Sequence, residues 1–247
     1  MKVINYISDP CRASSLPFWK TETIEIPENM LIVRGDEFDE RILAEYDDVP
    51  YFKLVHRLKD LTKPRIPDGF ELADCPAEAF AQHIRECYGN DISDEEITSY
   101  KTRQTFRPEL WIDVMDNAAK NIVFENSAEN KTAGKAAAAD KTTGKTVTAE
   151  NSAENKTAGK MIASGIAEFD ERIGEGALEW IQVSAGYRQT GLGKFIVSEL
   201  LWRLKASADF VTVSGQMNNT TDPLKLYLSC GFEDLVIWHV LTRKTPL

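Results

Sequence analysis

Residues 179–194, EWIQVSAGYRQTGLGK, limit the possible folds of this chain more than any other part of the sequence. The first residues, EWIQV, mix apolar and polar side chains as a half-buried strand does. The last residues open a helix that runs to about residue 206 and has a broad apolar face. A strand that passes through a short loop into such a helix is typical of folds in which helices cover a sheet.

The loop in this stretch carries the pattern R-x-x-G-x-G, which runs from Arg188 to Gly193. Glycine lets the backbone approach a ligand closely, and free N–H groups at a helix start favour an anion. Arg188 and Lys194 add positive charge, so the loop predicts a pyrophosphate site. It is not a dinucleotide fingerprint, which needs G-x-G-x-x-G at the start of a βαβ unit. A tight turn that binds nothing would use similar glycines, and the motif alone leaves that alternative open.

The sequence from residue 70 onward predicts ten elements in the order β-α-α-β-β-β-α-β-α-β. This order is typical of a mixed α/β sandwich. Ser93 and Glu96 form a capping box, and Asp222-Pro223 is a helix start. The predicted strands are 70–73, 110–115, 162–169, 177–184, 209–214 and 236–242, and the predicted helices are 76–88, 93–103, 191–206 and 222–230.

Residues 124–161 differ from the rest of the chain. They consist almost wholly of Ala, Lys, Thr, Glu, Asn and Gly, and the string ENSAENKTAGK occurs twice, at 125–135 and 150–160. Such a segment cannot bury enough apolar surface to offset the entropy lost on ordering. We therefore predict a low-complexity insertion at 124–161 that interrupts one strand of a β-hairpin.

Composition excludes several function classes. The net charge of −10 argues against nucleic acid as a partner, and it is compatible with a cationic substrate. No apolar run approaches the ~20 residues of a membrane span, and the first residues do not resemble a secretory signal, so we expect a cytoplasmic protein without a membrane partner. Four cysteines without a C-x-x-C pair and three scattered histidines predict no metal site.

The first 66 residues carry no recognisable chemistry. Residues 30–33 fit a strand and residues 51–61 fit a helix. We expect residues 1–66 to form an extension packed on a domain at 67–247.

Two motifs resemble those of one superfamily. Residues 183–193 are similar to V-x-P-x-x-R-x-x-G-x-G, the acetyl-CoA-binding motif of the GNAT N-acetyltransferases, with Ala185 in place of the usual proline. Residues 226–232, LYLSCGF, are similar to the L-Y-x-x-x-G-F of the same superfamily, and the two motifs lie about 40 residues apart in the expected order. The chain is thereby identified as a GNAT member, most similar to uncharacterised bacterial ones. The resemblance covers about 70–247.

The resemblance implies the GNAT acyl-CoA N-acyltransferase fold, a central mixed and mostly antiparallel sheet flanked by helices. It also implies acetyl-CoA as cosubstrate, no metal, and a strand before the loop that splays from its neighbour. The Val183 backbone would orient the acetyl group and donate to the developing oxyanion. Thr220 stands where relatives often carry an asparagine, so Asn219 or its neighbour Asn218 is expected to replace it. The implied cofactor-binding residues are Val183, Arg188, Gln189, Thr190, Gly191, Leu192, Gly193, Lys194 and Asn219.

Two catalytic residues are predicted. Tyr227 is the candidate general acid, because an unperturbed phenol with a pKa of about 10 keeps its proton at neutral pH. A core tyrosine is the alternative. Glu179 is the candidate base, because strand alternation would place it on the same face as Val183, with Trp180 on the other face in the core. A solvated strand carboxylate is nearly as good an explanation of Glu179. The other candidates for the base are Glu168, Asp170 and Glu175.

The predicted function is acetyl transfer from acetyl-CoA to a primary amine through a direct ternary complex. The alternative is a catalytically silent acyl-CoA-binding regulatory module of the same fold. The expected acceptor is a small-molecule amine or a peptide N-terminus. Formation of a homodimer stays open.

Overall fold

The computed structural model describes residues 2–89, 92–116 and 160–245, and these residues form a sheet of eight strands in the order β1-β8-β2-β7-β6-β5-β4-β3. Only β6 and β7 are parallel, and the other neighbours in the described sheet are antiparallel. The strands are β1 (Met30–Arg34), β2 (Tyr46–His56), β3 (Phe70–Ala73), β4 (Trp111–Asp116), β5 (Met161–Asp170), β6 (Glu175–Val183), β7 (Phe210–Gln216) and β8 (Glu233–Arg243).

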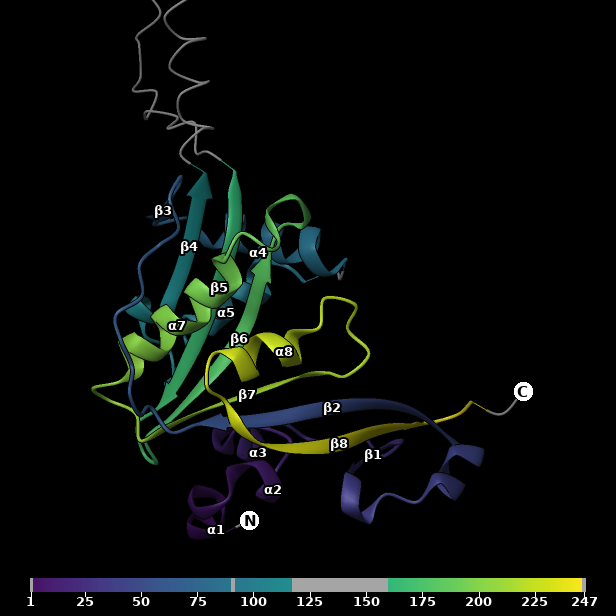
Figure 1. Ribbon diagram of the computed structural model, residues 1–247. Helices are drawn as coiled ribbons and strands as arrows, with labels where there is room; N and C mark the ends of the chain where they lie inside the picture. Colours follow the sequence, from purple (N-terminus) through teal and green to yellow (C-terminus); the bar gives the residue numbers. More distant parts are fainter. Residues whose placement is uncertain (1, 90–91, 117–159, 246–247) are drawn as a thin grey trace, which may run out of the picture.

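Helices cover both faces of this sheet (Figure 1). One apolar core joins α7 and α8 to the sheet, and a second joins α4 and α5 to the opposite face. Residues 2–24, here called the N-terminal arm, contain three short helices and pack against the second face through a third apolar cluster. The helices are α1 (Val3–Ser8), α2 (Pro10–Ala13), α3 (Phe18–Thr23), α4 (Ala77–Tyr88), α5 (Asp94–Tyr100), α7 (Leu192–Leu204) and α8 (Pro223–Ser229).

The ten elements predicted from residue 70 onward are all present, and the mixed sheet flanked by helices is confirmed. The predicted helix starts are also observed. The Ser93 hydroxyl accepts a hydrogen bond from the Glu96 N–H at 3.0 Å, and the Asp222 side chain caps α8 with Pro223 in its first turn. Strands β4 and β5 pair as the predicted hairpin. The insertion predicted at 124–161 lies outside the described residues except for its last two, and Met161 already belongs to β5.

The helix predicted at 51–61 is wrong, because residues 46–56 form strand β2. Phe52 and Leu54 pack into the core under α8, while Lys53 and Val55 are buried on the opposite face. A strand buried on both faces shows no apolar–polar alternation in its sequence, so its period cannot be read. Strand β2 lies between β7 and β8 in the sheet and is hydrogen-bonded to both. The sequence predicted residues 1–66 as an extension packed on the domain and did not predict this place inside the sheet.

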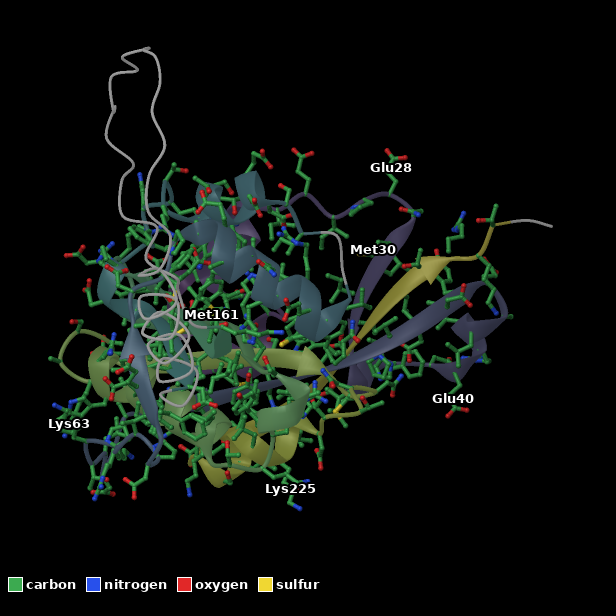
Figure 2. The ribbon with its side chains drawn as sticks, turned by 90° about the horizontal axis from the view of Figure 1, so that it is seen from above. Glu28, Met30, Glu40, Lys63, Met161 and Lys225 are labelled. Atoms are coloured by element: carbon green, nitrogen blue, oxygen red, sulfur yellow. The ribbon has the colours of Figure 1, made fainter. Side chains whose placement is uncertain are left out.

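One end of the sheet forms a wing, defined here as β1 with the parts of β2 and β8 beside it. Met30 and Glu40 lie at this end, and Lys63 lies at the opposite end of the molecule (Figure 2). None of the predicted site residues belongs to the wing, so the site is built by the rest of the sheet. Among the described residues no helix combines the length and apolarity that crossing a membrane requires.

Strands β6 and β7 separate part of the way along their length. They pair only from Glu175 opposite Phe210 to Leu178 opposite Val213. Beyond this point β6 continues to Val183 along β5, and β7 continues to Gln216 along β2. Figure 1 shows the two strands diverging from their paired ends. The splay expected of the strand before the loop is therefore confirmed, and it opens a gap in the middle of the sheet.

Candidate functional site

The loop between β6 and α7 leaves a run of backbone donors free. Gln189 and Gly191 have left-handed backbone conformations, with φ of 65° and 90°. Gly191 is the N-cap of α7 and offers no side chain to cap it. In the described part of the chain, the N–H groups of residues 189–194 donate to no acceptor. Consecutive N–H groups in such a turn form a concave anion site, so the loop fits the predicted pyrophosphate.

The two glycines of the motif act differently. The φ of 90° at Gly191 is a conformation that other residues adopt only with strain, whereas a Cβ atom there would make an ordinary contact with Pro67 at 3.7 Å. At Gly193 a Cβ atom would lie 3.3 Å from Leu226, because α8 packs closely on the start of α7. The first glycine therefore shapes the loop, and the second lets the two motifs approach each other.

The backbone of Val183 points into the gap. The Ser184 N–H donates to the Ile162 carbonyl at 2.8 Å, so these two residues form a hydrogen-bonded antiparallel pair. The neighbouring pair, Val183 opposite Ala163, is then a non-hydrogen-bonded pair. The Val183 N–H and C=O must point away from β5, toward the side from which β7 has departed. The carbonyl accepts from Arg188 Nε at 3.3 Å, and the N–H faces the gap as the prediction for Val183 requires.

A β-bulge changes the predicted geometry of Glu179. Trp180 has a φ of 50°, and the register between β5 and β6 shifts there, with Ser164 opposite Gln182 but Ile166 opposite Glu179. The extra residue places Glu179 on the face of the arm and Val183 on the face of α7. The prediction that the two share a face is wrong, because it assumed uninterrupted alternation. Trp180 also projects toward the arm side, where its Nε1 donates to the Tyr100 hydroxyl at 2.9 Å.

Glu179 is the first residue of β6 beyond its last pair with β7, so it lies where the gap begins. The side chain is 18% exposed and forms an ion pair with Lys20 of α3. The other candidates for the base are held by hydrogen bonds of their own: Glu175 accepts from Tyr6, Glu168 from Thr105, and Asp170 from Arg172.

In residues 2–89, 92–116 and 160–245, no cluster of three or more His, Cys, Asp or Glu side chains is arranged to hold a metal ion.

Tyr227 lies in the core beneath the gap. Its ring packs 6.0 Å from the ring of Phe52 and 5.6 Å from that of Phe232, measured between centroids. Its hydroxyl makes no hydrogen bond within the described part of the chain. Burial raises the pKa of the Tyr227 phenol well above its usual value, with smaller contributions from Tyr88, Cys230 and Glu179. The phenol therefore keeps its proton, and it lies within electrostatic range of the Glu179 carboxylate.

Asn219 stands in the turn before α8. Its side-chain oxygen accepts from the Thr221 N–H at 2.9 Å and from the Thr221 hydroxyl at 2.8 Å. These bonds fix the turn and orient the Asn219 amide. Its role toward a cofactor stays a prediction.

The sequence analysis missed the residues that hold the end of β6. His83, on the buried face of α4, bonds the Ser164 hydroxyl through Nδ1 at 2.8 Å and the Ser184 hydroxyl through Nε2 at 3.0 Å. The Tyr88 hydroxyl donates to the Ile181 carbonyl at 3.0 Å. A histidine within an apolar helix face was the available signal for this contact. Together these bonds fix the backbone on both sides of Val183.

We expect His83 to make the fold sensitive to mild acid. Burial lowers the pKa of the His83 imidazole to about 4, below its usual 6.5. Between these values the unfolded chain binds more protons than the folded chain, so the free energy of unfolding falls as pH drops from 6.5 toward 4, by about 3 kcal/mol in total. Urea denaturation at pH 7 and pH 4.5 measures this. The His83→Asn variant should lose clearly less stability over the same range, and an unchanged pH dependence would contradict the assignment.

No protein-family model matches the sequence, and a search of curated proteins gives no match either. Solved structures do match. A GCN5-related N-acetyltransferase from Sphaerobacter thermophilus aligns at 15% identity with a TM-score of 0.58, over 87% of this chain and 58% of that protein. The glucosamine N-acetyltransferase region of a fungal multi-domain GH3 β-N-acetylglucosaminidase aligns at 14% identity with a TM-score of 0.50, over 85% of this chain and 23% of that protein.

This chain thus spans 58% of the length of the Sphaerobacter protein. At such low identity the likeness concerns the fold. The chain has the GNAT fold that its two motifs predicted.

Proposed function

We propose that this GNAT-fold chain transfers an acetyl group from acetyl-CoA to a primary amine in a direct ternary complex. The observation that carries the proposal is the run of free N–H groups at residues 189–194, which lies beside the gap into which the Val183 N–H points. The first feature suits a pyrophosphate and the second suits a thioester carbonyl. Their adjacency is what a CoA thioester requires.

The residues of the loop bind and orient the cosubstrate. The N–H groups of residues 189–194 donate to the diphosphate, and the exposed side chains of Arg188 and Lys194 add positive charge. Asn219 is proposed to add a contact from the turn before α8. The Val183 N–H donates to the carbonyl oxygen of the thioester, and this bond strengthens as negative charge develops there.

Two side chains move the protons. Glu179 accepts a proton from the acceptor's ammonium, directly or through water, which leaves a neutral amine to attack. As the C–N bond forms and the C–S bond breaks, Tyr227 donates its proton to the departing sulfur, and the proton that the nitrogen then loses restores the Tyr227 phenol. Because burial raises the pKa of Tyr227, the phenol is protonated whenever the thiolate leaves.

The silent acyl-CoA-binding module remains a second candidate because of one observation. The proposed base, Glu179, is already in an ion pair with Lys20. A carboxylate held by a cation of its own chain is a poor base, and a binding module would have no need of a free one. Both candidates bind acetyl-CoA, and only the enzyme releases CoA when an amine is added.

The proposal is tested by thermal unfolding and thiol release. Acetyl-CoA at about 100 times its Kd should stabilise the fold by about 2.7 kcal/mol, seen as a higher melting temperature.

The Gly191→Ala variant should be destabilised by about 1–2 kcal/mol, because a left-handed conformation is strained with a Cβ atom. The melting temperature of this variant should also rise much less on addition of acetyl-CoA. Free CoA should appear with at least one amine of a panel.

The outcomes separate the candidates. Stabilisation by acetyl-CoA without thiol release for any amine supports the silent module. No stabilisation of the wild-type chain by acetyl-CoA refutes both.

A further inference from the structure

Glu168, Glu175 and Glu179 lie on the sheet face that the N-terminal arm covers, and each has a cation. Glu168 pairs with Arg103 at 3.1 Å. Glu175 is linked to Lys53 through the Tyr6 hydroxyl, which accepts from Lys53 Nζ and donates to Glu175. Glu179 pairs with Lys20. A buried carboxylate without a cation is costly, so these pairs are requirements of the fold or of the site.

The cation of Glu179 differs from the other two in where it comes from. Lys53 lies in the central strand β2, and Arg103 follows α5 directly, so both belong to the framework. Lys20 lies in α3, a helix of six residues in the peripheral arm. Among the three carboxylates, only Glu179 begins the gap between β6 and β7. The pair at the proposed reaction site is thus the one whose cation comes from the arm and not from the framework.

The Lys20 ammonium is held firmly in this position. The Phe18 N–H donates to Glu175 at 2.9 Å, and Glu22 pairs with Arg172 at 2.8 Å, so the chain is anchored on both sides of Lys20. The ammonium also lies 5.3 Å from the centre of the Trp19 ring. Burial acts to lower the pKa of Lys20, but the ion pair with Glu179 outweighs it and raises the pKa, so the group is charged at neutral pH.

We propose that Lys20 occupies the place of the acceptor's ammonium group, so that a primary amine on an unbranched alkyl chain binds at Glu179 in competition with the arm. The inference rests on the proposed function. Lys20 presents the same chemical group as the proposed substrate, to the same carboxylate, at the point where β6 and β7 cease to pair. No other cation in the described part of the chain pairs with Glu179.

The geometry also selects between the expected acceptors. The group seated at Glu179 is an ammonium at the end of four methylenes, reaching in from an anchored backbone. A peptide N-terminus instead carries its ammonium on a substituted carbon next to an amide. The site therefore favours small alkylamines, or the side chain of a lysine, over a peptide N-terminus.

The test is chemical rescue of a Lys20→Met variant with n-butylammonium, which reproduces the end of the lysine side chain. Calorimetry should show n-butylammonium binding at least tenfold more tightly to Lys20→Met than to the wild type, because the competing ammonium is gone. Its addition should also raise the melting temperature of Lys20→Met. Lys59→Met, which removes an exposed lysine without a partner in the described residues, should behave as the wild type. Adding Glu179→Gln to Lys20→Met should abolish the binding.

Equal binding of n-butylammonium to the wild type and to Lys20→Met would overturn the proposal, and so would tighter binding of glycinamide, which mimics a peptide N-terminus. If Lys20→Met does not fold, Lys20→Gln keeps a hydrogen bond to Glu179 and serves in its place. Failure of this test can be told apart from failure of the proposed function, because stabilisation of the wild type by acetyl-CoA is measured separately. If acetyl-CoA stabilises the wild type but n-butylammonium does not bind Lys20→Met more tightly, the ammonium site is refuted and the proposed function is not.

Discussion

Replacing Tyr227 by phenylalanine is expected to lower kcat for thiol release by about 100-fold or more, in the range typical of a lost general acid. The loss should fall on kcat, with the KM for acetyl-CoA close to the wild-type value, because the hydroxyl acts on the leaving sulfur and not on the diphosphate. Steady-state release of CoA, measured with any amine that the panel identifies as a substrate, checks this.

The same variant should fold almost as stably as the wild type. The ring keeps its packing against Phe52 and Phe232, and the hydroxyl has no partner among the described residues to lose. Removing an unbonded hydroxyl changes the free energy of unfolding by about 1 kcal/mol or less. Tyr46→Phe, in the wing, is the matched control and should retain full turnover. A Tyr227→Phe variant with wild-type kcat would show that Tyr227 is a core residue and nothing more.

The raised pKa of Tyr227 also fixes its contribution to the pH profile. The phenol stays protonated throughout the range in which an unperturbed tyrosine would begin to ionise, near pH 10. Below about pH 10, we therefore expect no fall in kcat with rising pH that is due to ionisation of Tyr227. This follows from burial and would not hold for a tyrosine in contact with water.

The sequence predicted the elements that depend on local signals. The capping box at Ser93, the Asp222-Pro223 helix start and the glycine-containing loop each have a local physical cause, and all lie where they were expected. The motif implied that the Val183 backbone faces the gap. In the structure this orientation follows from the register of β5 and β6. These features are encoded within a few residues of where they act.

The features that were missed depend on contacts between distant residues. Strand β2 is buried on one face by the core under α8 and on the other face by the N-terminal arm, so its own sequence shows no apolar–polar alternation. The bulge at Trp180 is one residue of extra length, and it reverses the face of Glu179 without any mark in the sequence. The pair between Lys20 and Glu179 spans 159 positions, and no spacing rule connects them.

Replacing Lys53 by methionine is expected to lower the free energy of unfolding by about 3–5 kcal/mol, the usual cost of leaving a buried charge without its counter-charge. Lys53 is fully buried and donates to the Tyr6 hydroxyl at 3.0 Å and to the carbonyls of Ser14 and Leu16 at 2.9 and 2.8 Å. Burial lowers the pKa of Lys53 to about 8, with Glu175 opposing the shift, so the ammonium is still charged at neutral pH. Methionine has a similar volume, and the effect is therefore that of the lost charge and hydrogen bonds.

A double-mutant cycle separates the charge from the packing. With Lys53 gone, Glu175 is left buried without its counter-charge, whereas the Glu175→Gln side chain is neutral and its amide oxygen can still accept from Tyr6 and Thr212, as Glu175 Oε1 does. Urea denaturation of both single variants and of the double variant should give a double-variant loss smaller than the sum of the single losses by more than 1 kcal/mol. Because Lys53 and Glu175 both bind the N-terminal arm, the arm should be cleaved by protease sooner in Lys53→Met than in the wild type. Additive losses with unchanged protection of the arm would mean that the two charges do not act as a pair, and that the arm is held by its apolar contacts alone.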